Sequence, residues 1–409
     1  MPSIISRYKG LPREIYILFF ARIINSIGAF VHPLLTLIMT DKLGMSAKDA
    51  GLFMTILLLT QLPTMLLGGK LADRFGRVKL LVVFQLLGAA TYLVCGFIET
   101  SNVTIYLIVL ASNFYAITYP AISAMAMDLT HAGNRKHAFG LLYMGLNIGF
   151  AVGPMIGGLL FKNYLHFVFI GDALTSIASI VLILVFVKET LLKKTQTENN
   201  SKLEKFEKGS VIGILLKRKV ILVVALILFL FSFSYAQMGF ALPIQMESLF
   251  INGAFQFGLL VSFNGVLVIF FTPLITTLIA KWKPLYGTFA GGLLYAAAFA
   301  VLIFAKGLLI FYLSMFLLTM GEIICAIDAY AFLADVSPAS HRGRLNSVVN
   351  MISNGGRMIS PLIIGQVIAT GGLAVGWLSV SAASLLGAVL LISFMNNRRI
   401  KKQINMIED

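Results

Sequence analysis

A series of apolar runs, each about 20 residues long, constrains the fold more than any other feature of the sequence. A helix of about that length crosses the hydrocarbon of a bilayer, and in lipid the backbone polar groups must bond within the segment. Charged residues make up 12% of the chain, about half their share in soluble proteins. The sequence therefore predicts an all-α polytopic membrane protein. Twelve spans are expected, at residues 14–39, 47–69, 78–98, 103–128, 138–161, 166–187, 220–246, 256–280, 284–305, 308–333, 345–370 and 374–396.

The formal net charge of +15 has a topological explanation. With the N-terminus placed in the cytoplasm, 26 of the 32 Lys and Arg residues fall in cytoplasmic segments and four in outer segments. The positive-inside rule then predicts that both termini are cytoplasmic. We expect a multi-pass protein of the cell (plasma) membrane that contacts lipids, functions as a monomer and does not bind nucleic acid.

A polar stretch divides the chain into two groups of six spans. Residues 188–219 hold nine basic residues mixed with Glu, Asn, Thr and Ser, a composition that cannot bury a core. We expect residues 1–187 to form an N-terminal six-helix half, 188–219 a cytoplasmic linker, and 220–409 a C-terminal half with a short basic tail.

The two halves repeat each other at an offset of 207 residues. Parallel halves related by an axis along the membrane normal are a transporter architecture, with the substrate site between them near the midplane. The repeat therefore favours transport over other membrane functions. The matching pairs are Asp128 and Asp335, Arg135 and Arg342, Asn147 and Asn354, Gly149 and Gly356, Pro154 and Pro361, and Gly158 and Gly365.

The loop between spans 2 and 3 carries a specific motif, with the sequence GGKLADRFGRVK from Gly68 to Lys79. Glycines permit a tight turn and close helix approach, and the carboxylate and the arginines can pair at helix ends. The loop resembles the signature loop of the major facilitator superfamily. That resemblance implies two pseudo-symmetric six-helix halves and a role for the loop in stabilising one end of an alternating-access cycle. The residues expected in conformational gating here are Gly69, Asp73, Arg74, Gly76 and Arg77.

Span 5 holds a second motif, which contains Gly149, Gly153, Pro154, Gly157 and Gly158. Glycines four residues apart form a flat face for close packing, and proline removes a backbone hydrogen bond where a helix bends. The motif resembles the one that marks exporters of the superfamily, although related patterns occur in some importers. Span 4 departs from the drug/proton antiporters, because residues 111–115 contain no arginine. The pairs Asp128 and Arg135, and Asp335 and Arg342, match the family and are also expected to act in gating.

Charged residues within spans are functional candidates because they are costly in lipid. Glu322 and Asp328 lie in span 10, and Arg357 lies in span 11. A Gly-Glu pair in span 10 resembles a branch of twelve-helix multidrug/proton antiporters, where the Glu contributes to the substrate or proton site. We expect Glu322, Asp328 and Arg357 to form a proton-coupling switch, and a static buried ion pair is the alternative.

In the N-terminal half, Arg22 in span 1 can snorkel to the cytoplasmic face or act structurally. His32 and Asp172 are further candidates, as a titrating group and a cavity residue. A mixture of aromatic and amide side chains suits an adaptable pocket for bulky amphipathic ligands. The residues expected to bind substrate are Asn25, Asn113, Tyr115, Tyr119, Tyr235, Gln237, Gln256 and Asn264.

The sequence has no phosphate-binding loop, no zinc-type Cys/His spacing and no nucleophile elbow. We therefore expect no enzyme activity, no metal and no cofactor, with the proton as coupling ion. The function that the resemblance implies is proton-coupled efflux of small amphipathic molecules by antiport. The alternatives are proton symport of a small polar solute, export of one endogenous metabolite or metallophore, and lipid flipping.

Overall fold

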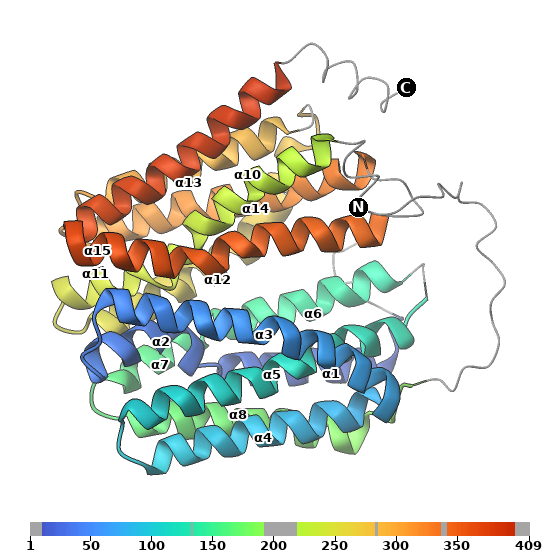
Figure 1. Cartoon of the computed structure of the whole chain (residues 1–409). Coiled ribbons are helices and arrows are strands. Elements are labelled where there is room, and N and C mark those ends of the chain that lie inside the picture. The colour runs from blue at the N-terminus through green and yellow to red at the C-terminus, as the bar shows by residue number, and fades with distance from the viewer. Residues whose placement is uncertain (1–9, 132–133, 192–218, 283–284, 337–341, 397–409) are drawn as a thin grey trace. The chain divides into compact units, whose positions relative to one another are not determined.

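The computed structural model describes residues 10–131, 134–191, 219–282, 285–336 and 342–396, and these contain helices and no strands (Figure 1). The helices are α1 (Arg13–Ile27), α2 (Val31–Leu37), η2 (Ile38–Lys42), α3 (Ala47–Phe75), α4 (Arg77–Phe97), α5 (Asn102–Asp128), α6 (Arg135–Phe150), α7 (Gly153–Phe161), α8 (Leu165–Phe186), α10 (Lys219–Tyr235), η3 (Ala236–Met238), α11 (Ala241–Leu249), α12 (Gly253–Ile279), α13 (Tyr286–Leu302), α14 (Leu308–Val336) and α15 (Arg342–Met395).

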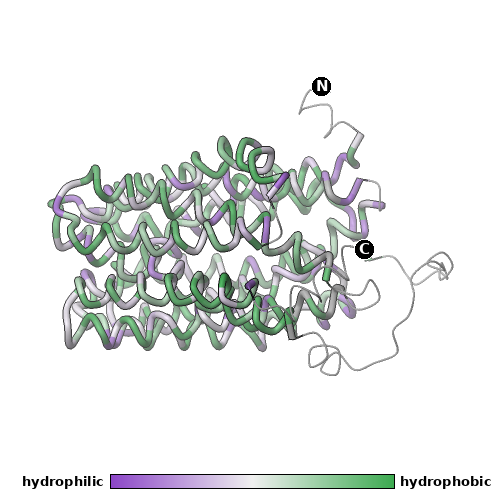
Figure 2. Tube along the Cα trace, turned by 90° about the horizontal axis from the view of Figure 1, so that it is seen from above, coloured by the Kyte–Doolittle hydropathy of each residue, from purple (hydrophilic) through white to green (hydrophobic). Residues whose placement is uncertain are grey.

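Ten helical segments within the described residues are long and apolar enough to cross a membrane. One of them, Val348–Met395 in α15, has 48 residues and is interrupted at Gly372, whose φ of 79° is not helical. Helix α13 is also apolar but has only 17 residues. Large apolar side chains lie exposed on these helices, for example Leu66 and Leu309, which are 73% and 82% exposed. Apolar residues dominate along the helices (Figure 2), as a lipid-facing surface requires.

Three of the expected spans are interrupted helices. The first breaks between α1 and α2, the fifth between α6 and α7, and the seventh at η3, ahead of α11. A proline lies within the first three residues of each continuing helix: Pro33 in α2, Pro154 in α7 and Pro243 in α11. Proline lacks an N–H and fits best in the first turn of a helix, so these prolines are compatible with a restart of each span. Proline alone does not cause the breaks, because other prolines lie inside α3, α5, α12 and α15.

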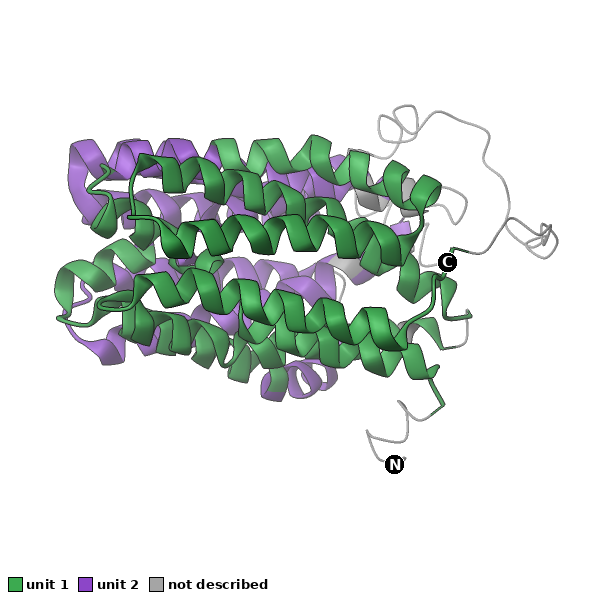
Figure 3. Cartoon of the chain, turned by 90° about the horizontal axis from the view of Figure 1, so that it is seen from below, with its two compact units in different colours: residues 1–46, 56–196, 242–269 green, residues 47–55, 197–241, 270–409 purple. Residues whose placement is uncertain are grey.

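The chain forms two compact units (Figure 3). Unit 1 comprises residues 1–46, 56–196 and 242–269, and unit 2 comprises residues 47–55, 197–241 and 270–409. The expected linker at 188–219 lies mostly outside the described residues. The division at this linker therefore stays a prediction.

In unit 1, α4 packs against α5 and α8, and α1 packs against α6 and α8. A buried apolar cluster joins these helices, with Ile15 and Leu18 from α1, Leu81 from α4, Met125 from α5 and Leu141 from α6. In lipid, such a cluster is stabilised by van der Waals packing between fitted side chains rather than by removal of apolar surface from water. Asn25, about two turns beyond Leu18 on α1, lies against α4 and α8.

In unit 2, α10 packs on α15, and α13 packs on α14 and α15. The ring of Phe299 in α13 stacks on Trp377 in α15, with centroids 5.8 Å apart. Phe231 in α10 meets Tyr295 in α13 edge to face at 5.8 Å. These aromatic contacts fix the three helices around the charged residues of α14 and α15.

Candidate functional site

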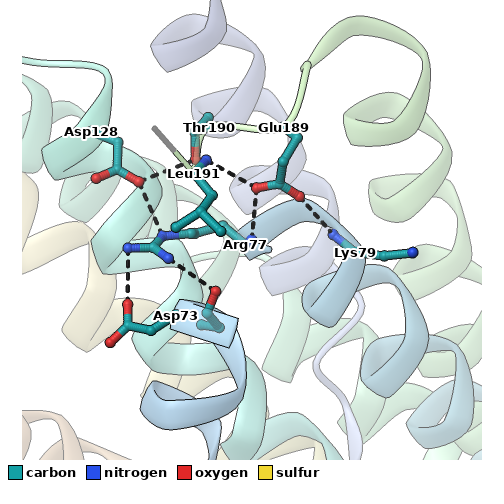
Figure 4. Close-up of polar contacts among 8 residues, drawn as sticks. Asp73, Arg77, Lys79, Asp128, Glu189, Thr190 and Leu191 are labelled. Carbon is teal, nitrogen blue, oxygen red and sulfur yellow. Dashed lines mark hydrogen bonds and ion pairs between the residues drawn. The ribbon is translucent and has the colours of Figure 1, made fainter. Parts of the chain in front are cut away.

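The signature loop centres on the Arg77 guanidinium (Figure 4). Nε of Arg77 donates to Oδ2 of Asp128 at 3.1 Å, Nη2 lies 3.0 Å from Oδ1 of Asp73, and Nη1 donates to the carbonyl of Ala72. The Arg77 side chain is 11% exposed and that of Asp128 is 22% exposed, whereas that of Asp73 is 73% exposed. Arg77 thus fastens the end of α5 to the turn between α3 and α4, mainly through Asp128.

Glu189, which follows α8, completes this loop. Its carboxylate accepts hydrogen bonds from the backbone N–H groups of Arg77 at 2.7 Å, Lys79 at 3.4 Å and Leu191 at 3.1 Å (Figure 4). Burial alone would raise the pKa of the Glu189 carboxyl, but these backbone donors lower it overall. Glu189 therefore caps the N-terminus of α4, where a negative charge is favourable.

Gly76 makes the close approach of Glu189 possible. Its φ of 105° is a conformation that other residues rarely adopt, and a Cβ here would overlap the Glu189 carboxylate. The turn of the signature loop thus requires glycine at this position for two independent reasons.

The structure separates some residues that the sequence pairs. Arg135 donates to the carbonyl of Thr130 at 3.3 Å, while the expected partner Asp128 binds Arg77 and the Thr190 hydroxyl. Arg74 lies over the ring of Phe75, and Gly69 is half-buried with only Pro120 near it. The side chains of Asp335 and Arg342 lie outside the described part of the chain, so this pair stays a prediction.

The glycines of span 5 lie against span 1. A Cβ on Gly149 would overlap Ser26, one on Gly153 would approach the Ile27 carbonyl at 2.6 Å, and one on Gly157 would crowd Phe30. The row therefore lets the backbone of α6 and α7 touch the region where α1 ends and α2 begins.

Each unit also contains two close contacts between a glycine of one helix and the backbone of another helix, and the two contacts of unit 1 correspond to the two of unit 2. In unit 1, a Cβ on Gly158 would overlap the Ala254 carbonyl, and one on Gly258 would overlap the Pro154 carbonyl. In unit 2, the same is true of Gly365 with Ala47 and of Gly51 with Pro361. The positions correspond at the offset of 207, so the sequence repeat extends to the contacts that its glycines make.

Two of the three charged candidates of spans 10 and 11, Glu322 and Arg357, lie near Tyr295 in unit 2. Glu322, Arg357 and Tyr235 all act electrostatically on the Tyr295 hydroxyl. The Arg357 guanidinium lies over the Tyr235 ring, 5.3 Å from its centroid, and the two tyrosine rings are 6.3 Å apart. An intramembrane carboxyl and a guanidinium thus share one aromatic environment.

Asp328 has a different position from the other two. Its Oδ2 accepts hydrogen bonds from the Thr288 N–H at 2.7 Å and the Thr288 hydroxyl at 2.8 Å, which caps the first turn of α13. Within the described residues, Asp328 and Arg357 form no ion pair with each other. The observed geometry of Asp328 is that of a helix cap.

Four helices of unit 1 share a polar network. Oδ1 of Asn25 in α1 accepts hydrogen bonds from Gln85 of α4 at 2.9 Å and from Ser176 of α8 at 3.1 Å. The Tyr115 hydroxyl of α5 donates to Ser176 Oγ at 3.1 Å. Tyr119 follows one turn later on α5 and is 46% exposed. Asn25, Tyr115 and Tyr119, all expected to bind substrate, therefore lie together.

Two of the other expected pocket residues hydrogen-bond to residues elsewhere in their own unit. Asn113 is bound to Thr60 and Thr64 of α3, and Gln237 is fully buried and donates to Ser360. Gln256 and Asn264 lie half-buried in α12. The structure gives Asn113 and Gln237 roles in helix packing.

The remaining N-terminal candidates also have defined positions. Asp172 is buried and its Oδ2 accepts the Val31 N–H at 3.3 Å, so it caps the restarted helix α2. His32 is exposed. Asp172 is thereby a structural residue of the break in span 1.

Sequence reasoning did not single out Glu189, Gln85 or Ser176. Gln85 could have been identified from the sequence, because an amide in an apolar span must find a polar partner. The sequence indicates Glu189 less clearly, as the first acidic residue after span 6.

Among the described residues, no group of three or more His, Cys, Asp or Glu residues is placed to hold a metal ion. Long apolar helices, two repeated sets of close glycine contacts and intramembrane polar clusters define a polytopic membrane protein of a transporter type. Comparison with protein families matches residues 18–327 to the Major Facilitator Superfamily, and the chain belongs to that superfamily.

Individual relatives are distant in sequence, and two of the three named here match along most of the chain. The chain is 25% identical over 399 residues to a Na(+), Li(+), K(+)/H(+) antiporter of Planococcus maritimus, covering 89% of this chain and 91% of the relative. It is 27% identical to the class B tetracycline resistance protein of Escherichia coli, with 80% of each chain covered. It is 28% identical to the multidrug resistance protein MdtH of Yersinia pestis over 41% of each chain.

Solved structures share the fold at low sequence identity. A POT peptide transporter in complex with sulfate has a TM-score of 0.75 at 17% identity, covering 98% of this chain and 96% of that one. The nucleoside transporter NupG has a TM-score of 0.76 at 16% identity, with 95% and 100% covered. At such identities the likeness establishes the fold alone.

Proposed function

We propose that the chain is a proton-coupled antiporter that exports small amphipathic molecules through the cell membrane by alternating access. The observation that carries the proposal is the Glu322 carboxyl, which lies within an apolar helix and shares the Tyr295 environment with Arg357. A carboxyl group in low dielectric favours its protonated form, and an approaching guanidinium favours the charged form. Small movements of α15 relative to α14 therefore load or release a proton at Glu322.

The names of relatives support antiport and export. These names describe cation/proton antiport, tetracycline resistance and multidrug resistance. We also propose the complete topology of twelve crossings, with both termini in the cytoplasm. In this topology α15 crosses twice, turning near Gly372, and α13 crosses once.

The test is proton-driven accumulation in inverted membrane vesicles, using a panel of amphipathic dyes. Replacement of Glu322 by Gln keeps the side-chain shape and removes the titrating group. We expect Glu322→Gln to abolish accumulation driven by the proton gradient while substrate equilibration continues. Glu99→Gln, which removes an exposed carboxyl between α4 and α5, is the matched control and is expected to transport normally. Accumulation by Glu322→Gln at the wild-type level would remove this residue from coupling.

A monovalent metal cation is the second candidate substrate. The name of the 25% identical relative favours it, since that protein is called a Na(+), Li(+), K(+)/H(+) antiporter. The same vesicles distinguish amphipathic molecules from metal cations as substrates. Dissipation of the proton gradient by added Na⁺ or K⁺, in the absence of any dye, supports cation exchange.

A further inference from the structure

Arg22 in α1 is an intramembrane cation that pairs with no carboxylate among the residues that the structure describes. It lies nine residues after Arg13, about 13 Å further along the helix. Its Nε is buried without a hydrogen-bond partner, and no hydrogen bond or ion pair of Arg22 exists within the described part of the chain. The burial of Nε argues against a side chain that simply extends into water.

The groups around Arg22 are neutral hydrogen-bonding groups. The residue that acts on it electrostatically is Tyr119 of α5. Asn25 lies one turn further along α1, with its Oδ1 engaged by Gln85 and Ser176 and its Nδ2 without an acceptor in the described residues. Asp172 acts electrostatically on Tyr119, but its carboxylate is engaged by the backbone of Val31. Among the described residues, the Arg22 guanidinium, the Asn25 Nδ2 group and the Tyr119 hydroxyl therefore lie near one another, and none of the three donates a hydrogen bond.

A charge inside the membrane is expensive unless it is paired. A guanidinium matches carboxylate and phosphate groups because its planar fork donates two parallel hydrogen bonds. We propose that Arg22, with Asn25 and Tyr119, binds the anionic group of the transported molecule, so that the substrates are amphipathic acids or zwitterions. This inference rests on the proposed transport function and names its substrate class. A metal cation is repelled at this position and must bind elsewhere.

The test compares three probes that share one ring system: 1-naphthaleneacetate, 1-naphthaleneacetamide and 1-naphthylmethylammonium. Binding is measured by calorimetry to the full chain in phosphatidylcholine nanodiscs. The acid is expected to bind about tenfold or more tightly than the amide or the amine, as charge-assisted hydrogen bonds allow.

Variants assign this preference to one side chain. Arg22→Gln is expected to reduce acid binding to the level of the amide and to leave amide binding unchanged, whereas Arg22→Lys retains part of the preference. Arg13→Gln removes the same charge at the start of the same helix, where Arg13 lies over the Phe186 ring, and serves as the control. Tyr119→Phe keeps the ring and removes the hydroxyl. This variant is expected to weaken binding of the acid by several-fold and to leave binding of the amide and the amine unchanged. It remains informative if Arg22→Gln does not fold.

Equal binding of the three probes by the wild type, or equal losses of acid binding in Arg22→Gln and Arg13→Gln, would overturn the inference. Lysophosphatidylglycerol identifies the source of the anion. If it displaces the acid in an Arg22-dependent manner, the group is a lipid headgroup. If it does not, the group belongs to a free solute.

Failure of the inference is distinguishable from failure of the transport proposal. Arg22-dependent binding of the acid without proton movement would leave the anion site standing and remove the proton coupling. Proton-driven transport of cationic dyes with no preference for the acid would support the proton coupling and remove the anion site.

Discussion

At the scale of single residues, the signature loop depends on one buried guanidinium with two unequal carboxylate partners. Arg77 is 11% exposed and Asp128 is 22% exposed, while Asp73 is 73% exposed. Exposed ion pairs contribute about 0–1 kcal/mol, whereas loss of one partner from a buried charged pair costs more.

We therefore expect Asp128→Asn to lower the melting temperature of the purified protein clearly more than Asp73→Asn does. The two variants make the same chemical change around the same arginine, so each controls for the other. Equal shifts would show that exposure does not govern the strength of these contacts.

Glu189 predicts a pH dependence with a definite sign. Its pKa in the folded protein is lowered by backbone donors, so it stabilises the fold above its ordinary value of 4.5. That contribution is lost as the pH falls through the lowered folded pKa. The difference in melting temperature between the wild type and Glu189→Gln should be full at pH 7, shrink as the pH falls below 4.5, and disappear only below the lowered folded pKa. A difference that persists unchanged at acid pH would contradict the capping role.

At the scale of helices, glycine positions decide which backbones touch. A Cβ on Gly258 or Gly51 would overlap a proline carbonyl, whereas nothing lies within 4 Å of the Cβ position of Gly307. Overpacking of a tight contact costs about 1–3 kcal/mol.

Gly258→Ala and Gly51→Ala should therefore both lower thermal stability, and by similar amounts because the contacts correspond in the repeat. Gly307→Ala is the control and should change stability little. Thermal unfolding of the three purified variants measures this. An effect of Gly307→Ala as large as the other two would show that the close contacts are not what the glycines preserve.

The sequence predicted which segments become helices far better than it predicted where those helices break. Length and apolarity indicate a span, but the breaks at Gly28–Phe30 and Ala151–Val152 depend on partners from other helices, such as Asp172 for α2. For the same reason the sequence does not predict the hydrogen-bond partners of Asn113, Gln237 and Asp328, whose roles in the site stay predictions. Their packing partners Thr60, Ser360 and Thr288 are far away in the sequence, so only the fold reveals that these side chains are engaged.

At the scale of the whole molecule, the distribution of Lys and Arg predicts the orientation in the membrane. Single cysteines in place of Glu99 and Lys306 should react with a membrane-impermeant maleimide in intact cells. A cysteine in place of Lys281 should react only after permeabilisation. The two native cysteines, Cys95 and Cys325, are buried, which keeps the background low. The opposite labelling pattern would invert the topology.

An antiporter moves substrate and protons in opposite directions. The luminal pH of proteoliposomes that contain the purified protein and a trapped pH indicator measures the direction of proton movement. Addition of a transported amphipathic acid to the outside should raise the luminal pH as protons leave in exchange. The Glu322→Gln protein should show no such change. A fall in luminal pH on the same addition would mean that protons enter with the substrate, and it would contradict the antiport account in favour of symport.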